Sequence, residues 1–254
     1  MDFPFAVEPA RFVERPNRFL VLAELAGGRV VRVHCTDPGR LRELLLPGVL
    51  IYISRARVSP SKRSTDYDLR FVEHPRTGHL VSLDTRLPNQ LVAEALAHDL
   101  LVPFRGNTGW RSETPGPLHA GSGVHSRFDF RIEGADGRRC WVEVKSVTLV
   151  EDRVARFPDA PTVRGQRHAE GLTRIVQETQ DRGAVLFIVQ RPDADVVEPH
   201  WTRDSAFAHA LARAAQTGVQ LMAYTCELTL ASARLDRAIP VNIVPPSGER
   251  NETP

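Results

Sequence analysis

The chain has 254 residues, of which 42% are hydrophobic and 25% are charged, and its formal net charge is +2. This composition is typical of a soluble globular protein with one large domain or two ordinary ones. It excludes a protein that crosses the membrane by helices, because no apolar run approaches the roughly 18 residues that a span requires. The N-terminal segment has no basic stretch followed by an apolar one, so we expect no signal peptide and no association with a membrane.

The three cysteines, Cys35, Cys140 and Cys226, are widely separated, and each lies in an apolar run. An odd number of buried thiols favours a reducing compartment, so we expect a cytoplasmic protein. The sequence has no CxxC motif or Cys/His cluster of the kind that binds zinc.

The first 86 residues predict a small all-β domain. Their strand-like segments are rich in Val, Ile, Leu, Phe and Tyr and cover residues 18–25, 28–35, 49–56, 65–74 and 79–85. The segment 37–48 suits one short helix that ends at Pro47-Gly48. Five strands with one interposed helix predict a closed β-barrel, for which an OB-like fold is our first choice.

The barrel segment is mildly basic. Residues 1–86 carry 14 Lys and Arg against 10 Asp and Glu, whereas the rest carries 19 against 21. This difference allows the barrel to bind a polyanion. Five arginines are suited to follow a nucleic-acid backbone: Arg11, Arg15, Arg18, Arg40 and Arg42. The rings of the following residues are candidates for stacking on bases: Phe12, Phe19 and Tyr52. The alternative is that these rings belong to the core of the barrel.

Residues 87–254 predict an α/β domain with a mixed sheet. A helix is expected over 87–104, with Asn89 as its N-cap, followed by a hairpin of two strands joined by the turn at 134–137. The remaining segments predict a helix at 165–181, a buried strand at 184–190, a helix at 204–218 and a strand at 219–230. The domain boundary is therefore expected between residues 86 and 87.

The second strand of the hairpin contains the sequence CWVEVKSVTL, which holds two charges among apolar residues. Glu143 and Lys145 are two residues apart, so they face the same side of the strand. Lys145 is also unusual because lysine supplies only two of the 33 basic residues, the other being Lys62. Burial of a charge costs several kcal/mol, so each of these groups needs a partner or a metal.

Two further acids are expected near this pair. Asp129 lies on the other strand of the hairpin, and Glu94 lies on the preceding helix, where it can face the sheet. Carboxylates that converge with one lysine form a site for Mg²⁺ or Mn²⁺, which Asp129 and Glu143 would bind. Such a site suits metal-assisted phosphodiester hydrolysis by Asp129, Glu143, Lys145 and Glu94.

A structural role for the pair is the alternative, because Glu-x-Lys on one strand is common as an ion pair at a sheet edge. The order of acidic helix, Asp strand, Glu-x-Lys strand and helix is similar to that of restriction-endonuclease-like nucleases, whose loose signature is Asp, a variable gap, then Asp/Glu-x-Lys. That signature is short and matches other chains by chance.

Longer motifs give a more specific resemblance. The segments RFDFRI, CWVEVKSVTLVED and FPDAPTVRGQRHAEGL resemble the sugar fermentation stimulation protein family (SfsA), as do RPNRFLV, VHCTDPGRLRELLLPG, LDTRLPNQLVAEAL and AYTCEL. The resemblance implies an OB-like domain followed by a nuclease-like domain, DNA binding, and a link to the regulation of sugar metabolism, of maltose genes especially. It also places the nuclease-type acids at Asp129 and Glu143, the lysine at Lys145 and the helical acid at Glu94.

The chain departs from the family pattern after Glu113, where a loop rich in Pro, Gly and His is inserted before Arg127. We interpret it as a surface insertion and its His119 and His125 as loop residues rather than metal ligands. The segment 157–168 follows the hairpin and brings Arg164, Arg167 and His168 to the start of a helix, which suits phosphate binding, although it can equally pack and cap that helix. With Arg127, these residues complete the predicted nucleic-acid surface.

The sequence therefore predicts a DNA-binding protein with a metal-dependent nuclease site and little sequence readout. A non-catalytic regulator built on a nuclease-like scaffold remains the alternative. The choice between DNA and RNA, the strandedness of the substrate and the oligomeric state, including a homo-oligomer, stay open.

Overall fold

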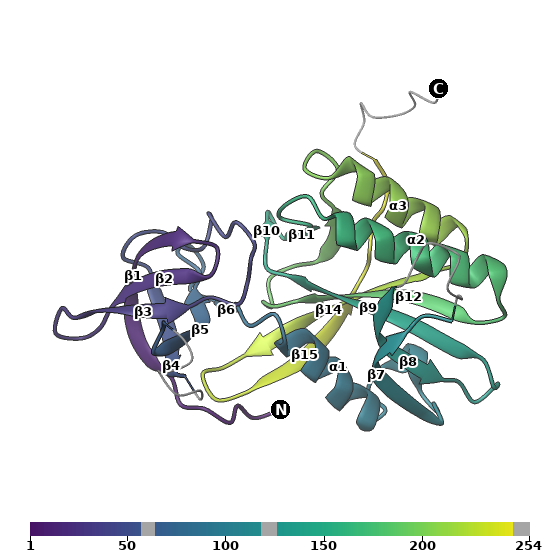
Figure 1. Cartoon of the computed structure of the whole chain (residues 1–254), viewed down its shortest axis with the longest axis horizontal. Helices are drawn as coiled ribbons and strands as arrows, with labels where there is room; N and C mark the ends of the chain where they lie inside the picture. The colour runs from purple at the N-terminus through teal and green to yellow at the C-terminus, as the bar shows by residue number, and fades with distance from the viewer. Residues whose placement is uncertain (57–63, 118–125, 246–254) are drawn as a thin grey trace.

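The structure is a computed structural model that describes residues 1–56, 64–117 and 126–245. Two units lie side by side: a β-barrel formed by the N-terminal strands, and a larger unit in which helices cover a sheet (Figure 1). None of the helices in these ranges has the length and apolar character that a membrane crossing requires.

The barrel has six strands: β1 (Glu8–Asn17), β2 (Leu20–Glu24), β3 (Val30–His34), β4 (Leu50–Arg55), β5 (Tyr67–Glu73) and β6 (Leu80–Ser82). Their order is β3-β2-β1-β4-β5-β6, and a parallel pairing of β3 with β5 closes the sheet. The closed sheet protects most strand edges and encloses a core to which every strand contributes buried apolar residues. The predicted barrel is confirmed, but β1 was not expected as a strand.

The helix predicted over residues 37–48 is wrong, because this segment forms turns. Asp37 Oδ1 accepts a hydrogen bond from the backbone N–H of Gly39 (2.8 Å), and Leu41 has a positive φ of 50°, which a helix cannot contain. Leu41 and Leu44 are nearly fully buried in the barrel core. Their spacing reflects that burial and not a helical stripe.

The larger unit begins with α1 (Leu87–Ala97) and the short 3₁₀ helix η2 (Val102–Phe104). Its main sheet has the order β15-β14-β12-β9-β8-β7 and is mixed, since β9, β12 and β14 run parallel and the outer strands are antiparallel. These strands are β7 (Gly109–Pro115), β8 (Arg127–Glu133), β9 (Arg139–Val147), β12 (Arg182–Val189), β14 (Gln220–Leu228) and β15 (Ala233–Ile239). A small second sheet contains β10 (Val150–Glu151), β11 (Val154–Phe157) and β13 (Val196–Pro199).

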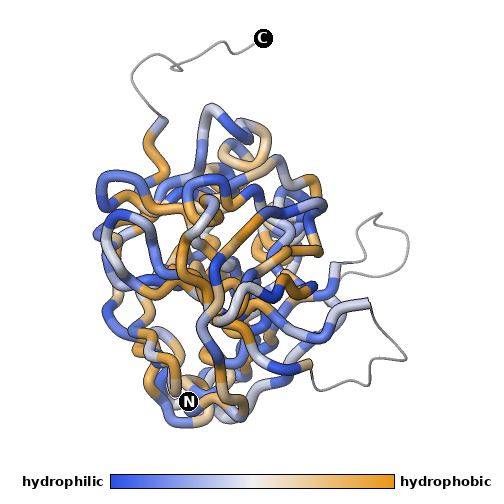
Figure 2. The backbone as a smooth tube through the Cα atoms, turned by 90° about the vertical axis from the view of Figure 1, so that its left-hand side faces the viewer, coloured by the Kyte–Doolittle hydropathy of each residue, from blue (hydrophilic) through white to orange (hydrophobic). Residues whose placement is uncertain are grey.

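Helices cover both faces of the main sheet. α2 (Val163–Glu178) and α3 (Ser205–Gln216) share one apolar core with the sheet, whereas α1 shares another on the opposite face (Figure 1). Figure 2 shows the apolar segments gathered mainly inside the molecule and the polar segments mainly on its outer loops. β9 and β12 are central strands buried on both faces, which explains their nearly unbroken apolar sequences.

The mixed-sheet α/β prediction is confirmed. The hairpin of β8 and β9, the buried strand β12 and the helices α2 and α3 lie close to the predicted ranges. The edge strand β15 was not predicted, because its sequence ARLDRAI alternates with charges that remain exposed. Asn89 is not the N-cap of α1, which Arg86 provides without a side-chain hydrogen bond.

Candidate active site

A cleft of about 710 Å³ lies between the two units and contains two of the predicted acids, Asp129 and Glu143. The barrel contributes Arg18 and the loop Asp37–Gly39, and the sheet contributes Asp129, Glu143, Lys145 and Ser146. The far wall is formed by residues 156–162 together with Arg164 at the start of α2. The boundary between the units is therefore also the place where the charged residues of the hairpin reach solvent.

The backbone pairing of β8 with β9 ends at the cleft, where the side chain of Asp129 accepts a hydrogen bond from the backbone of β9. The pairs between β8 and β9 run from Glu133–Arg139 to Phe130–Val142, and Asp129 comes next. Its Oδ2 accepts a hydrogen bond from the backbone N–H of Val144 (2.7 Å), and its Oδ1 accepts one from Asn89 Nδ2 (2.9 Å). The carboxylate is thus held in place by a strand and by the first turn of α1.

Glu143 and Lys145 form the buried centre of the site. Lys145 Nζ donates to Glu143 Oε1 (2.6 Å), and the two side chains are only 11% and 5% exposed. The ring of His168 on α2 contacts the same oxygen through Nδ1. The other oxygen, Glu143 Oε2, is buried and finds no hydrogen-bond partner among the described residues.

The pKa values of the two carboxyl groups are shifted in opposite directions. Burial, followed by repulsion from Glu143, raises the pKa of Asp129, and the hydrogen bonds from Val144 and Asn89 only partly offset this. Burial also opposes ionisation of Glu143, but the hydrogen bond from His168 and the charge of Lys145 outweigh it and hold its pKa below the ordinary value. Glu143 is therefore an anion at neutral pH whose second oxygen lacks a compensating partner.

The donor set fits a hard divalent cation. Carboxylate oxygens of Asp129 and Glu143 line the cleft, and the unpartnered Oε2 of Glu143 is a buried acceptor that a cation would satisfy. No group of three or more His, Cys, Asp or Glu side chains with metal-binding geometry occurs within the described ranges. Two carboxylates suit Mg²⁺ or Mn²⁺, which commonly keeps water and substrate oxygens as its remaining ligands.

Two family models match the chain. One is described as the SfsA N-terminal OB domain and covers residues 13–83, and the other is the sugar fermentation stimulation protein RE domain and covers residues 86–232. The sugar fermentation stimulation protein homolog of Desulforamulus reducens is 40% identical over 234 residues, which are 92% of this chain and 92% of that one. The homolog of Moorella thermoacetica is 40% identical over 243 residues, 96% of this chain and all of its own.

The chain belongs to the SfsA family. A solved structure described as Pyrococcus furiosus SfsA in complex with Ca²⁺ matches it with a TM-score of 0.80 and 29% identity, over 95% of this chain and 98% of that one. The OB assignment of the barrel and the mixed-sheet α/β fold predicted for the second unit are therefore confirmed.

Within this SfsA fold, Glu94 does not lie with the other acids. Its carboxylate pairs with the N-terminal amine of Met1 (3.0 Å), outside the residues that line the cleft. Asn89 faces Asp129 instead, and five residues along a helix correspond to a rotation of about 140°, which turns Glu94 away. Glu113 is exposed on β7, also outside the cleft lining, and His119 and His125 lie outside the described residues.

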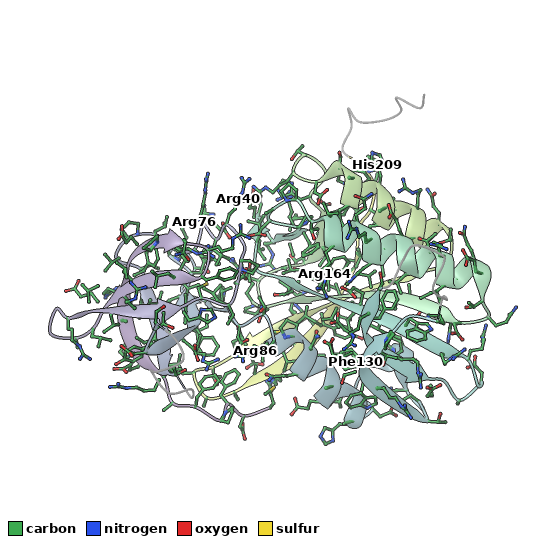
Figure 3. All side chains as sticks on the ribbon, in the orientation of Figure 1. Arg40, Arg76, Arg86, Phe130, Arg164 and His209 are labelled. Carbon is green, nitrogen blue, oxygen red and sulfur yellow. The ribbon has the colours of Figure 1, made fainter. Side chains whose placement is uncertain are left out.

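The residues predicted to bind nucleic acid fall into three groups according to their location. Arg18 of the barrel and Arg164 of α2 both line the cleft. Arg40 lies on the barrel side of the boundary, where its backbone N–H donates to Asp159 Oδ2 (2.7 Å); Figure 3 labels Arg40 and Arg164. Exposed residues outside the cleft lining are Arg11, Arg127 and Arg167. The third group is His168 alone.

His168 was predicted to contact phosphate, but its side chain is 6% exposed and faces Glu143. Its ring also packs on Phe128, with ring centroids 5.9 Å apart. The structure therefore assigns it to the support of the acid site. The motif RGQRH predicted that His168 lies on a helix, but only the packing of α2 on the sheet shows that its partner is Glu143.

Sequence reasoning missed Asn89, Ser146 and Gln190. Ser146 lines the cleft and accepts a hydrogen bond from Nε2 of the fully buried Gln190 (2.7 Å). The alternation along β9 places Ser146 on the face opposite Lys145, so no sequence periodicity connects it with the acids.

Proposed function

We propose that this SfsA protein is a metal-dependent phosphodiesterase that acts on DNA and holds it mainly through phosphates. The observation that carries the proposal is the buried, unpartnered Oε2 of Glu143 beside Asp129 in the cleft. A carboxylate oxygen that lacks any donor costs free energy, and a divalent cation would remove that cost. The Pyrococcus furiosus relative described as a Ca²⁺ complex supports a divalent cation in this family.

Asp129 and Glu143 would hold Mg²⁺ or Mn²⁺. The cation would supply a polarised phosphoryl oxygen and a water of lowered pKa. The raised pKa of Asp129 favours this role, because a cation relieves both its burial and its repulsion from Glu143. The proposal thus explains why two acids share a poorly hydrated site.

Lys145 and His168 would act on the reacting phosphate and on Glu143, respectively. Lys145 Nζ lies next to Glu143 Oε1 at the cleft, so its charge is available to stabilise the negative charge that develops on the phosphate. His168 contacts the same oxygen and orients the carboxylate so that Oε2 remains free. His168 is therefore proposed as a positioning residue.

DNA phosphates would bind along the cleft walls. Thr162 is the N-cap of α2, and its hydroxyl accepts a hydrogen bond from Gly165 N–H (3.0 Å), while Arg164 lines the cleft beside it. A helix N-terminus with an arginine attracts anions, and Arg18 faces it from the barrel. These contacts read no base, which supports binding with little sequence preference.

A non-catalytic DNA-binding regulator of sugar metabolism is the second candidate. It is favoured by the position of Glu94, which leaves two carboxylates rather than three at the site, with the neutral Asn89 beside them. It shares the cytoplasmic location that we propose, with which three buried free cysteines are compatible. It predicts salt-dependent binding and no cleavage.

A cleavage assay separates the two candidates. Wild type, Asp129→Asn and Lys145→Ala are incubated with labelled single-stranded DNA, duplex DNA and RNA in Mg²⁺, Mn²⁺ or EDTA. The matched control is Asp136→Asn, which changes an exposed aspartate in the turn of the same hairpin. We expect metal-dependent cleavage by wild type and the control, and a loss of about 100-fold or more in the other two variants.

Equal cleavage by wild type and Lys145→Ala would refute the catalytic assignment. Absence of cleavage with every metal, together with binding that weakens steeply with salt, would favour the regulator.

A further inference from the structure

We propose that Phe19 is a base-stacking platform for single-stranded nucleic acid on the barrel. The inference deepens the proposed function by assigning an unpaired strand as the ligand. It rests on the proposed function for the reaction that takes place in the cleft. It begins with the exposure of one ring. Phe19 is 48% exposed, whereas every other Phe, Tyr and Trp side chain in the described ranges is buried or partly buried.

The two other rings considered from the sequence do not have this property. Phe12 is 4% exposed and belongs to the barrel core, as expected for a small barrel. Tyr52 is only partly exposed. Among the described residues Phe19 is therefore the one aromatic ring of the barrel that is exposed to water, and a partner that covers it would bury apolar surface.

The backbone holds Phe19 in a fixed position although its ring is exposed. Its N–H donates to Asn17 Oδ1 (2.9 Å), and its C=O accepts from Cys35 N–H (3.0 Å). The imidazole of His34 lies nearly parallel to the ring, at 28° and 6.4 Å between centroids. A ring fixed in this way can accept a base without first losing much conformational entropy.

Two arginines lie near the ring. The guanidinium carbon of Arg18 lies 5.8 Å from the centroid of Phe19. Arg32 lines a shallow hollow of about 490 Å³ beside the ring, and its Nε donates to the carbonyl of Ser64 (3.0 Å). An exposed aromatic face with arginines near it suits a base together with its flanking phosphates.

Arg18 also connects the platform with the cleft, since it lines the cleft that holds Asp129 and Glu143. A nucleic acid that places a phosphate at Arg18 can therefore extend into the cleft in one direction and reach Phe19 in the other. Only an unpaired strand can use both, because a duplex keeps the faces of its bases stacked inside the helix. The arrangement favours a single strand over a duplex.

Fluorescence anisotropy with the full-length chain tests the platform. The probes are a fluorescein-labelled thymidine oligonucleotide of about 12 nucleotides and a duplex of the same length, in EDTA so that no metal-dependent cleavage occurs. Phe19→Ala is expected to bind the single strand about tenfold more weakly and the duplex unchanged. Phe19→Leu should resemble Phe19→Ala, and Phe19→Trp should bind at least as tightly as wild type.

The matched control is Leu46→Ala, which truncates an aliphatic side chain of the barrel that is 44% exposed. It is expected to leave both affinities unchanged. Circular dichroism melting of each variant shows whether it is folded, and Phe19→Leu keeps an apolar side chain should Phe19→Ala be unstable. Sedimentation of the free protein reports whether the exposed ring serves contact with a second copy.

Single-strand affinity of Phe19→Ala equal to wild type would overturn the platform, as would an equal loss for single strand and duplex. Self-association that depends on Phe19 while oligonucleotide affinity does not would overturn it in favour of a second copy. Binding as predicted by a protein that never cleaves refutes only the proposed function. Cleavage by wild type with unaltered binding by Phe19→Ala refutes only the platform.

Discussion

Replacement of Lys145 by methionine removes the positive charge from the centre of β9 while keeping a side chain of similar length. Glu143, whose side chain is 5% exposed, then loses the donor at 2.6 Å. Removal of one member of a buried ion pair costs about 3–5 kcal/mol in the free energy of unfolding. Because His168 still contacts the same carboxylate oxygen, we expect the lower end, about 3 kcal/mol.

Thermal unfolding followed by circular dichroism measures this loss in metal-free buffer. For a unit of this size, about 3 kcal/mol corresponds to a decrease in Tm of about 10 °C. The double variant Glu143→Gln/Lys145→Met removes both charges and should recover most of the loss, because a neutral pair carries no desolvation cost. Arg138→Met is the control: it breaks an exposed pair with Asp136 and should cost at most about 1 kcal/mol.

A Tm of Lys145→Met within about 2 °C of wild type would refute the view that Glu143 is a buried anion whose charge Lys145 compensates. A double variant less stable than Lys145→Met would also contradict it, because Glu143 would then contribute through contacts other than its charge.

Three further changes have defined outcomes. Gly39→Ala places a Cβ 2.2 Å from Asp159 Oδ2, so this carboxylate must give up its hydrogen bond to the barrel loop, and urea unfolding should show a loss of about 1.5–3 kcal/mol. Burial raises the pKa of Asp37 from an ordinary 3.8 to about 6, so the folded state binds its proton more tightly than the unfolded state. Through this group wild type should therefore lose about 2 kcal/mol as pH rises from 4 to 7, whereas Asp37→Asn lacks this loss and gains in Tm relative to wild type. Trp141→Phe removes the Nε1–H donor to the buried Asp181 (2.9 Å) and should cost about 1–3 kcal/mol in urea unfolding.

Each of these outcomes can fail separately. Unchanged unfolding of Gly39→Ala would mean that the loop and Asp159 move apart at no cost. A constant Tm difference between Asp37→Asn and wild type from pH 4 to pH 7 would contradict the raised pKa of Asp37. Unaltered stability of Trp141→Phe would show that Asp181 finds another donor.

The central strands could be predicted from the sequence because burial on both faces leaves an apolar run. β12 and β9 are examples, and the alternation along β9 placed Glu143 and Lys145 on one face. β1 and β15 were missed because charged and exposed residues interrupt their apolar positions. The helix predicted over residues 37–48 is wrong because leucines that lie in turns and pack into the barrel core can have helical spacing.

Part of the site depends on packing that no local pattern encodes. The proximity of Asp129 to Glu143 could be predicted because the two strands of a hairpin are neighbours in sequence. The choice between Asn89 and Glu94 depends on the rotation of α1 about its axis, which the packing of the helix on the sheet determines. The role of His168 requires the packing of α2 on the sheet.

The cleft itself is a further case, since it forms where the barrel meets the sheet. Arg18 and Asp37 precede Asp129 by about 90 residues or more of sequence, yet all three line it. Only contacts between the units, such as Arg40 N–H to Asp159, bring them together.

Diffraction from crystals soaked in Mn²⁺ and measured at the manganese absorption edge tests the cation site most directly. We predict an anomalous peak between Asp129 and Glu143, bonded to Glu143 Oε2, that is lost in Asp129→Asn. Crystals that take up Mn²⁺ elsewhere, or not at all at millimolar concentration, would contradict the metal site and with it the proposed phosphodiesterase.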